Sequence, residues 1–497
     1  MLCDHSTRNL DSLMPDIFSN AVALSRMQFA FTAIFHMLWP VLTTGMAIYL
    51  VILEVLWLKT KNPDYYRHAR FWSKLYVLNF GIGVASGLPM EFQFGTNWAP
   101  FSEAVGDFFG SILGFEGSMA FMLEAGFLGI MLFGWERVPP AIHLLSTVMV
   151  AFGANLSTFW ILVANSWLQT PAGGEFVSGK FVVSDYFEAI LNPFMVNSVG
   201  HMFFATLETS LFVIGGISAW FILRGADQRH AAFFSRSFKI VLMVAIAAAP
   251  LQIWIGHLSA EQVRVHQPTK LAAMEAQWET IPAGTKADWS VIAAPNVAAE
   301  RNDWNISIPN GLGYILELKP TLSEPVYGLK HWPERDRPHM VGLVYYAFRT
   351  MVGIGLFLAG LATVTLVQWL RGKLADSEIS AQKWLLRGWL LAAPLGYLAV
   401  ESGWVVRCVG RQPWTVYGQL RTADMASHLP AGEVLASLLG FILLYSFLFI
   451  SAMYFGRRII MTGPNLELPL PGQAQQPDAI LAPVEHSPDR RPVETQQ

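Results

Sequence analysis

The sequence predicts an all-α, polytopic membrane protein with nine transmembrane helices. Of its 497 residues, 53% are hydrophobic and only 14% are charged, whereas charged residues make up about a quarter of an ordinary soluble domain. This balance excludes a soluble enzyme, a disordered chain and a fibrous repeat. The net charge of −3 provides no basic surface for nucleic acid, and the two cysteines, Cys3 and Cys408, are too few for a disulfide framework.

Apolar runs long enough to cross a bilayer, about 20 residues each, recur along the chain. The second run is the weakest because it contains several glycines and Pro89, but the charge pattern of the loops requires it. The predicted spans are 29–58, 74–95, 109–135, 141–168, 199–223, 238–259, 340–370, 384–406 and 433–456.

Lysine and arginine in the loops predict how the spans are oriented. Basic residues gather after odd-numbered spans, as in 59–74, 224–239 and 371–387. Because cytoplasmic loops carry an excess of Lys and Arg, we expect the N-terminus outside and the C-terminus in the cytoplasm. Three arginines after span 8 break this rule, which indicates a specific role for them: Arg407, Arg411 and Arg421.

Three polar segments lie outside the predicted spans: one before span 1, one between spans 6 and 7, and one after span 9. The segment between spans 6 and 7 is too long to be a simple connector. The C-terminal segment is rich in Pro, Gln and Glu and is predicted to be a disordered cytoplasmic tail. The N-terminal segment lacks the apolar region of a signal peptide, and Met14 is an alternative start. The predicted division is 1–28, 29–259 (spans 1–6), 260–339 (outer loop), 340–456 (spans 7–9) and 457–497.

Ionisable side chains inside the spans are costly in lipid and therefore indicate function. His36 and His201 lie in separate spans, where each is either a haem ligand or a histidine that hydrogen-bonds across the bundle. Met351 beside Arg349 favours haem, because a guanidinium in lipid needs an anion such as a haem propionate. His201 and Met351 are therefore the predicted axial pair of a low-spin haem.

Two acids of the third span, Glu116 and Glu124, are predicted to relay protons. Their spacing of eight residues places them two turns apart and about 80° around a regular helix. The alternative is a pair of protonated carboxyls satisfied by nearby serines and backbone groups, but a staggered pair of acids is unusual in an apolar helix.

Two polar segments outside the spans have local patterns of their own. In the outer loop, residues 267–279 taken alone predict a short solvated amphipathic helix. Residues 410–414, which follow span 8, predict an interfacial turn.

With these features in place, the sequence resembles subunit I of cytochrome bd-type quinol oxidases over roughly residues 15–460. The resemblance implies a subunit that oxidises quinol at the outer face and reduces O2 to water with protons from the cytoplasm, generating proton motive force without pumping. The outer loop, of roughly 80 residues, looks like the short form of that family's Q-loop. The motifs are 24–30 (LSRMQFA), 95–98 (GTNW), 270–275 (KLAAME) and 410–414 (GRQPW).

The resemblance also implies three haems near the outer face. His201 and Met351 match the ligands of a low-spin haem b, with Arg349 beside it, and His36 matches the ligand of a high-spin haem. The cofactors are thus low-spin haem b, high-spin haem b, and haem d or a b-type haem in its place. The two high-spin types are not assigned to particular ligands.

Further roles follow residue by residue from the same resemblance. Lys270 and Glu275 match loop residues of quinol oxidation, and Glu116 and Glu124 match acids of proton delivery. Because the loop lies outside the membrane, we expect its residues far from the iron ligands. Three more residues are predicted to line the haem and reaction sites: Arg26, Trp404 and Arg411.

The implied partners are ubiquinol or another quinol, O2, the lipid membrane, a second large subunit of similar topology and a small single-helix subunit. The implied location is the bacterial inner membrane. Two other functions compete with the quinol oxidase. One is a bd-like haem redox protein with altered oxygen chemistry. The other is a proton-coupled transporter, which the absence of a visible internal repeat disfavours.

Cys408 departs from the family pattern. The family has a glutamate three residues before the arginine of the GRQPW motif, and that carboxylate ligates the third haem. A thiolate can also bind haem iron, but a buried thiol resists ionisation. Glu401 lies two turns earlier on the same helical face, and Glu116 is a further alternative. The third ligand is therefore assigned to Cys408 or Glu401, with the carboxylate favoured.

Replacing Cys408 tests this assignment. Because a carboxylate is the favoured ligand, Cys408→Ser should leave the haem content and the visible spectrum unchanged. Cys408→Glu, which restores the carboxylate at the family's position, serves as the comparison and should give the spectrum of a typical member. Loss of one high-spin haem in Cys408→Ser would show that the sulfur is the ligand.

Overall fold

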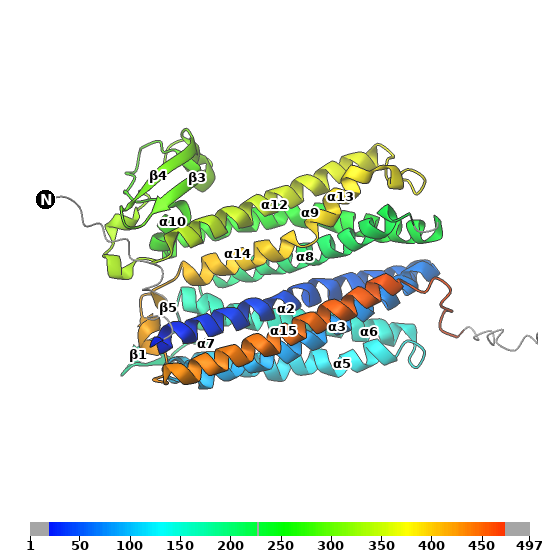
Figure 1. The fold of residues 1–497 in the computed structure, drawn as a ribbon, viewed down its shortest axis with the longest axis horizontal. Coiled ribbons are helices and arrows are strands. Elements are labelled where there is room, and N and C mark those ends of the chain that lie inside the picture. The colour runs from blue at the N-terminus through cyan, green and yellow to red at the C-terminus, as the bar shows by residue number, and fades with distance from the viewer. Residues whose placement is uncertain (1–18, 226–227, 473–497) are drawn as a thin grey trace, which may run out of the picture.

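The computed structural model describes residues 19–225 and 228–472. Within these residues, nine helical spans are long and apolar enough to cross a membrane, so the predicted all-α membrane fold is confirmed. The spans run side by side in an elongated bundle, and the short strands gather at one end (Figure 1). The predictions for Cys3 and Met14 lie outside the described residues.

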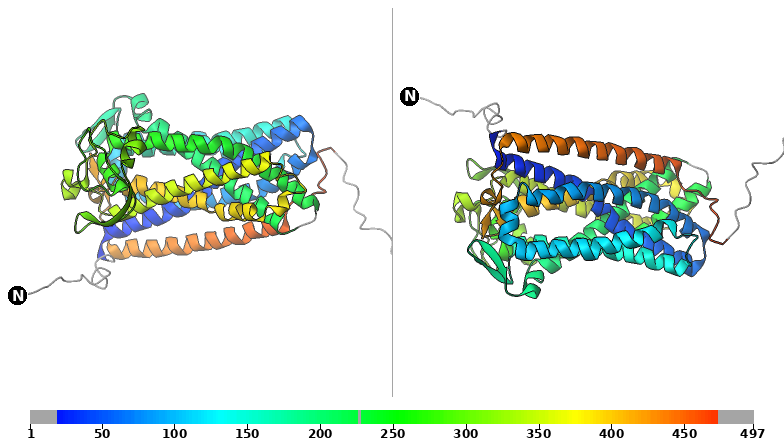
Figure 2. Two further views of the ribbon diagram at one scale, coloured as in Figure 1. Left: turned by 90° about the horizontal axis from the view of Figure 1, so that it is seen from above. Right: turned by 90° about the horizontal axis from the view of Figure 1, so that it is seen from below.

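Two of the spans are interrupted. The third contains a π-helical segment, η1, and the eighth breaks at Ala393 and Pro394. The last span, α15, lies along the outside of the bundle next to α2 (Figure 2). The spans are α2 (Ala21–Thr60), α3 (Pro63–Gly95), α4–η1–α5 (Ala99–Phe115, Glu116–Phe121, Met122–Phe133), α6 (Pro140–Gln169), α8 (Met195–Leu223), α9 (Gln228–His266), α12 (Val341–Leu370), α13–α14 (Lys383–Ala392, Leu395–Val409) and α15 (Ala431–Thr462).

Short elements complete the structure, most of them at the end of the bundle that carries the long loop. The strands form three antiparallel hairpins, and in the longest Trp289 pairs with Ile308 and Asn296 with Arg301. The short elements are β1 (Gly174–Val177), β2 (Lys180–Val183), α7 (Tyr186–Ile190), α10 (Pro268–Glu275), β3 (Trp289–Asn296), β4 (Arg301–Ile308), α11 (Gly311–Glu317), η2 (Leu329–His331), η3 (Glu334–Asp336), η4 (Ile379–Ala381), β5 (Trp414–Val416), β6 (Leu420–Arg421) and η5 (Thr422–Met425).

The helices extend beyond the predicted boundaries of the apolar segments. Residues 21–28, predicted as part of an N-terminal segment, already belong to α2, and α9 includes the first seven residues of the predicted outer loop. Hydropathy marks only the stretch that lies in lipid, whereas backbone hydrogen bonding carries a helix on into the polar region.

The prediction of a disordered tail from residue 457 is wrong for its first part. Helix α15 continues to Thr462, and Leu466 is buried against the core of the bundle. Arg229 donates to the Leu466 carbonyl at 2.8 Å and Arg67 donates to the Leu468 carbonyl at 3.3 Å. The leucines of this segment have apolar surface to bury, which overall composition conceals.

The outer loop folds back onto the bundle. In α10, residues 269–275 are all buried, so the predicted solvated amphipathic helix is wrong. Leu271 and Met274 pack in one cluster with Val344 of α12 and Val406 of α14. The small residues of this helix let it seat closely on two membrane helices, and this places its polar side chains inside the protein.

Close packing of α2 on α8 depends on Gly45. A Cβ at this position would lie 2.8 Å from Ser210 Cβ and would also meet the Thr206 carbonyl oxygen. Gly45→Ala should therefore lower the free energy of unfolding by about 1–3 kcal/mol, the usual effect of overpacking a core. Thermal unfolding in detergent measures this. Gly106→Ala is the control, because a Cβ there meets nothing within 4 Å. Equal melting temperatures for both variants would contradict the packing argument.

Candidate functional site

The two predicted haem histidines sit against glycines of neighbouring helices. His36 of α2 packs on α3, where a Cβ at Gly87 would lie 3.0 Å from the His36 Cε1 atom. Ser86 Oγ lies 3.1 Å from His36 Nδ1. A hydrogen bond at one ring nitrogen is the usual arrangement in a histidine that binds metal through the other.

His201 of α8 is partly buried, and its buried Nδ1 atom has no hydrogen-bond partner among the residues described. A Cβ at Gly256 of α9 would lie 3.3 Å from His201 Cε1. Met351 of α12 occupies a similar position against α14, where a Cβ at Gly403 would lie 3.0 Å from the sulfur. A buried imidazole nitrogen without a hydrogen bond is costly in a protein that has no ligand there, so His201 fits the role of an axial haem ligand.

The anion that neutralises Arg349 of α12 comes from the outer loop rather than from a haem propionate. Its guanidinium forms a two-point ion pair with Glu275 of α10, at 2.7 Å from Nη2 to Oε2 and 3.3 Å from Nη1 to Oε1. Nη2 also donates to the Ser290 carbonyl at 2.7 Å, and Nε to the Val291 carbonyl at 3.2 Å. Glu275, which is predicted to take part in quinol oxidation, therefore contacts Arg349, two residues before Met351.

Lys270 is buried to 2% exposure at the junction of the loop with α14. Its Nζ atom is within hydrogen-bonding distance of Gln169 Oε1 at 2.6 Å, of Gln267 Oε1, and of the Arg407 carbonyl at 3.2 Å. Burial lowers the pKa of Lys270 well below its ordinary range, and the charges of Arg411 and Arg407 lower it further. The expectation that the loop lies far from the predicted iron ligands is wrong, because Arg407 adjoins Cys408.

Arg407 and Arg411 present unsatisfied guanidinium groups in the same region. Arg407 donates to Asn165 Oδ1 and to Ser198 Oγ, but its Nη2 atom has no partner in the described chain. Arg411 is buried, and its Nε and Nη1 atoms are likewise unpartnered among those residues. Buried cations without acceptors are strongly unfavourable, so these residues fit an anionic ligand such as the propionates of a haem.

The candidates for the third haem ligand share one face of α14. Cys408 is a partly buried free thiol. Glu401 Oε2 and Trp404 Nε1 are both buried without a hydrogen-bond partner in the described residues. An orphaned carboxylate oxygen fits an iron ligand, which favours Glu401 over the thiol. Arg26, by contrast, is exposed on α2, and no hydrogen bond joins it to the other predicted site residues within the described range.

The predicted proton-relay acids each accept a hydrogen bond from a neighbouring helix. Ser157 of α6 donates to Glu116, and Tyr76 of α3 donates to Glu124 at 2.8 Å. At Gly153 of α6, a Cβ would lie 2.9 Å from the Glu124 backbone nitrogen. The predicted offset of 80° does not apply, because η1 replaces the regular α-helix between the two acids.

Sequence reasoning missed a second buried polar cluster. Glu54 of α2 lies 2.8 Å from His143 Nδ1 and accepts a 2.6 Å hydrogen bond from Thr147, both on α6. His143 falls inside a predicted span, so the rule used for His36 and His201 would have identified it.

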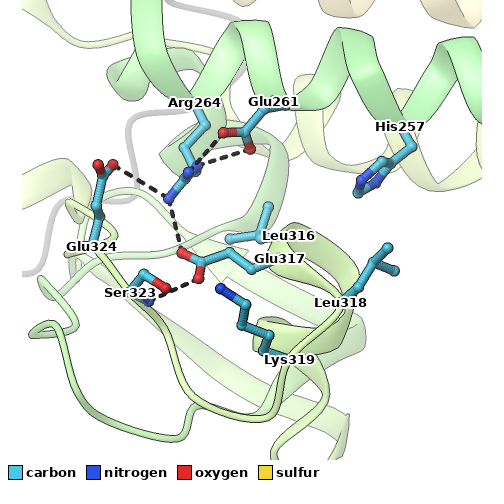
Figure 3. A pocket seen from close by; sticks show the side chains of 9 residues that line it. All are labelled: His257, Glu261, Arg264, Leu316, Glu317, Leu318, Lys319, Ser323 and Glu324. Carbon is cyan, nitrogen blue, oxygen red and sulfur yellow. Dashed lines mark hydrogen bonds and ion pairs between the residues drawn. The ribbon is translucent and has the colours of Figure 1, made fainter.

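A polar surface pocket of about 330 Å³ lies where α9 meets the end of α11 (Figure 3). Arg264 of α9 lines this pocket and forms ion pairs with Glu261 at 2.7 Å, Glu317 at 3.1 Å and Glu324 at 3.6 Å. These contacts attach the loop to the C-terminal end of α9. None of the predicted site residues lines this pocket.

Comparison with known proteins gives consistent matches. The family model described as cytochrome bd terminal oxidase subunit I matches residues 24–464. Cytochrome bd-II ubiquinol oxidase subunit 1 of Escherichia coli K12 is 35% identical over 90% of this chain and 97% of that protein. Cytochrome bd ubiquinol oxidase subunit 1 of Bacillus subtilis 168 is 36% identical over 86% and 91%, respectively. The solved bd oxidase of Geobacillus thermodenitrificans superimposes with a TM-score of 0.81 at 29% identity, covering 90% of this chain and 99% of that one.

Removing the unpaired guanidinium of Arg411 tests whether this region holds an anionic cofactor. Arg411→Gln should weaken haem retention by roughly tenfold or more, because a hydrogen bond to a charged group contributes about 1.5–3 kcal/mol. The haem-to-protein ratio after detergent washing measures this. Arg421→Gln is the control, because Arg421 already pairs with Asp336. An unchanged ratio in Arg411→Gln would show that the cation has no haem to hold.

Proposed function

The chain belongs to the cytochrome bd terminal oxidase subunit I family, and we propose that it is the quinol-oxidising, oxygen-reducing subunit of a quinol oxidase in the bacterial inner membrane. The observation that carries this proposal is the junction of the outer loop with the haem-ligand helices. Glu275 of the loop forms an ion pair with Arg349, and Lys270 reaches the Arg407 carbonyl beside the third predicted ligand.

Haem is the cofactor that the family implies, and the buried polar atoms of the site fit it. His201 and Met351 would hold the low-spin haem b, His36 a high-spin haem, and Glu401 or Cys408 the third. The high-spin pair is haem b together with haem d or another b-type haem. When bound, haem transfers electrons and binds O2 at an open coordination position. Arg407 and Arg411 would anchor propionates.

Quinol oxidation is assigned to Lys270 and Glu275 at the outer face. Burial and two neighbouring guanidinium groups lower the pKa of Lys270 well below its ordinary range and so favour the neutral amine. The neutral amine keeps two of the three hydrogen bonds and has a lone pair that can accept a proton from a quinol hydroxyl. Burial raises the pKa of Glu275, although the Arg349 charge opposes this shift. Two proton acceptors on one short helix match the two protons that a quinol releases. The quinol is ubiquinol or a close relative.

Proton uptake is assigned to Glu124 and Glu116, from the cytoplasmic side inward. Tyr76 and Ser157 hold the two carboxylates in place by donating hydrogen bonds to them. With the N-terminus outside and the C-terminus in the cytoplasm, quinol protons leave on one side and protons for water enter from the other. This separation generates proton motive force without a pump.

A second large subunit and a small single-helix subunit are the proposed protein partners. The third span has only 17% of its most apolar stretch buried within this chain, as has α15. Met119 and Met122 of the third span are exposed there, although the nearby Ala120 and Glu124 are buried. We assign this face to the large partner and the remaining apolar surface to lipid.

Cys408 supports one alternative, a bd-like haem redox protein with altered oxygen chemistry. The visible reduced-minus-oxidised spectrum of the purified complex, recorded with oxygen uptake on a short-chain ubiquinol, separates the two functions. The quinol oxidase should show low-spin and high-spin bands and quinol-dependent oxygen uptake. Low-spin bands without high-spin bands would identify the alternative, and a spectrum without haem bands would refute both.

Met351→Leu tests the low-spin assignment. The swap nearly conserves volume, so it should cost less than about 1.5 kcal/mol of stability. Leucine has no lone pair for iron, and the six-coordinate low-spin signal should therefore disappear while the His36 haem remains. Met340→Leu, at an exposed position just before α12, is the matched control. A low-spin spectrum that persists in Met351→Leu would show that Met351 is not a ligand of this haem.

A further inference from the structure

The contacts of Arg349 go almost entirely to the outer loop. A guanidinium has five N–H donors. Here Nε donates to Val291, Nη2 donates to both Ser290 and Glu275, and Nη1 donates to Glu275. Four donors are therefore used by loop acceptors, which leaves one N–H for any other ligand. This count differs from the expectation that a propionate is the main partner of Arg349.

Aromatic rings hold the guanidinium in this orientation. Its carbon lies 4.8 Å from the ring centre of Tyr345, 5.2 Å from that of Trp289 and 5.3 Å from that of Phe348. Trp289 belongs to strand β3 of the loop, whereas the other two rings belong to α12. The charge is thus enclosed by rings from both sides of the junction, which is a favourable environment for a planar cation.

Strand β3 is attached to α12 by further hydrogen bonds. Tyr346 Oη donates to the Ala293 carbonyl at 2.9 Å, and Tyr345 Oη lies 3.4 Å from the Ser290 carbonyl. Residues near the start of α12 therefore hold the first part of strand β3, from Trp289 to Ala293. Because Met351 lies on the same helix, directly after these residues, the loop and the predicted haem ligand share one support.

We propose that Arg349 is a positioning residue of the quinol site, which holds the Glu275 carboxylate and strand β3 against α12. This inference rests on the proposed function, because it assigns Glu275 to quinol oxidation. Arg349 keeps the carboxylate at a constant place relative to Met351. Quinol then meets an acid whose position does not depend on loop motion.

Lysine at position 349 should fail in this role although it keeps the charge. An ammonium cannot form the two-point contact with a carboxylate, and it does not stack between rings as a guanidinium does. Arg337→Lys is the matched control, because the ion pair of Arg337 with Glu300 and its hydrogen bond to the Trp332 carbonyl both stay within the loop.

Two measurements on the membrane-embedded complex test the proposal. Tryptic cleavage of the outer loop should become about tenfold faster in Arg349→Lys, because a loss of about 1.4 kcal/mol of attachment changes the open population tenfold. The KM for quinol should rise by a similar factor, while oxygen uptake from an artificial electron donor that bypasses the loop is retained. Arg337→Lys should leave the KM unchanged.

Glu275→Gln completes the test through a double variant. If the pair acts as one contact, Arg349→Lys combined with Glu275→Gln should be cleaved no faster than the more sensitive single variant. The proposal would be overturned if the loop of Arg349→Lys stayed fully protected from trypsin, with an unchanged KM and only a shifted low-spin haem potential. Arg349 would then be a residue that interacts with the haem. Cleavage rates are measurable even in a chain that oxidises no quinol, so failure of the proposed function is distinguished from failure of this inference.

Discussion

Charge buried at the end of the bundle that carries the long loop is the constraint on which the rest of the structure depends. Arg349, Lys270 and Arg411 are all held inside the protein, where an unpaired cation is far more costly than in water. Only Arg349 has a carboxylate partner, Glu275, among the described residues. The loop must therefore fold onto the helices to satisfy it, and the remaining cations require acceptors that the chain itself supplies only in part.

The cost of burying these charges explains the architecture around them. Helix α10 has two alanines at its centre and packs its Leu271 and Met274 against α12 and α14, which carries Lys270 and Glu275 inward. Glycines at three positions, Gly87, Gly256 and Gly403, leave room for the side chains predicted to bind haem iron. Small residues thus occur where a functional side chain of one helix approaches the backbone of another. Rigid helices, rather than mobile loops, position the chemistry, which favours precise geometry.

The sequence predicted which ionisable residues lie in the spans better than it predicted which residues they contact. Glu116, Glu124, His36 and His201 were identified from the sequence because ionisable groups are rare in lipid-embedded helices, whereas His143 was missed. The partners of the first four were not identified. Tyr76, which bonds Glu124, is an ordinary aromatic residue by sequence and lies 48 positions away. The π-helical segment at Glu116 was also not predicted, because hydropathy does not distinguish π from α geometry.

By itself, the sequence determined the all-α membrane fold and its nine spans, because the thickness of the bilayer imposes a length and a composition that can be read locally. It also determined the residue types available for haem, quinol and protons. Only the tertiary structure decided that Glu275 pairs with Arg349, 74 positions away, and that Lys270 bonds Gln169, 101 positions away. Such contacts depend on how helices pack and how the loop returns to them, and no local pattern of hydrophobicity or charge specifies either.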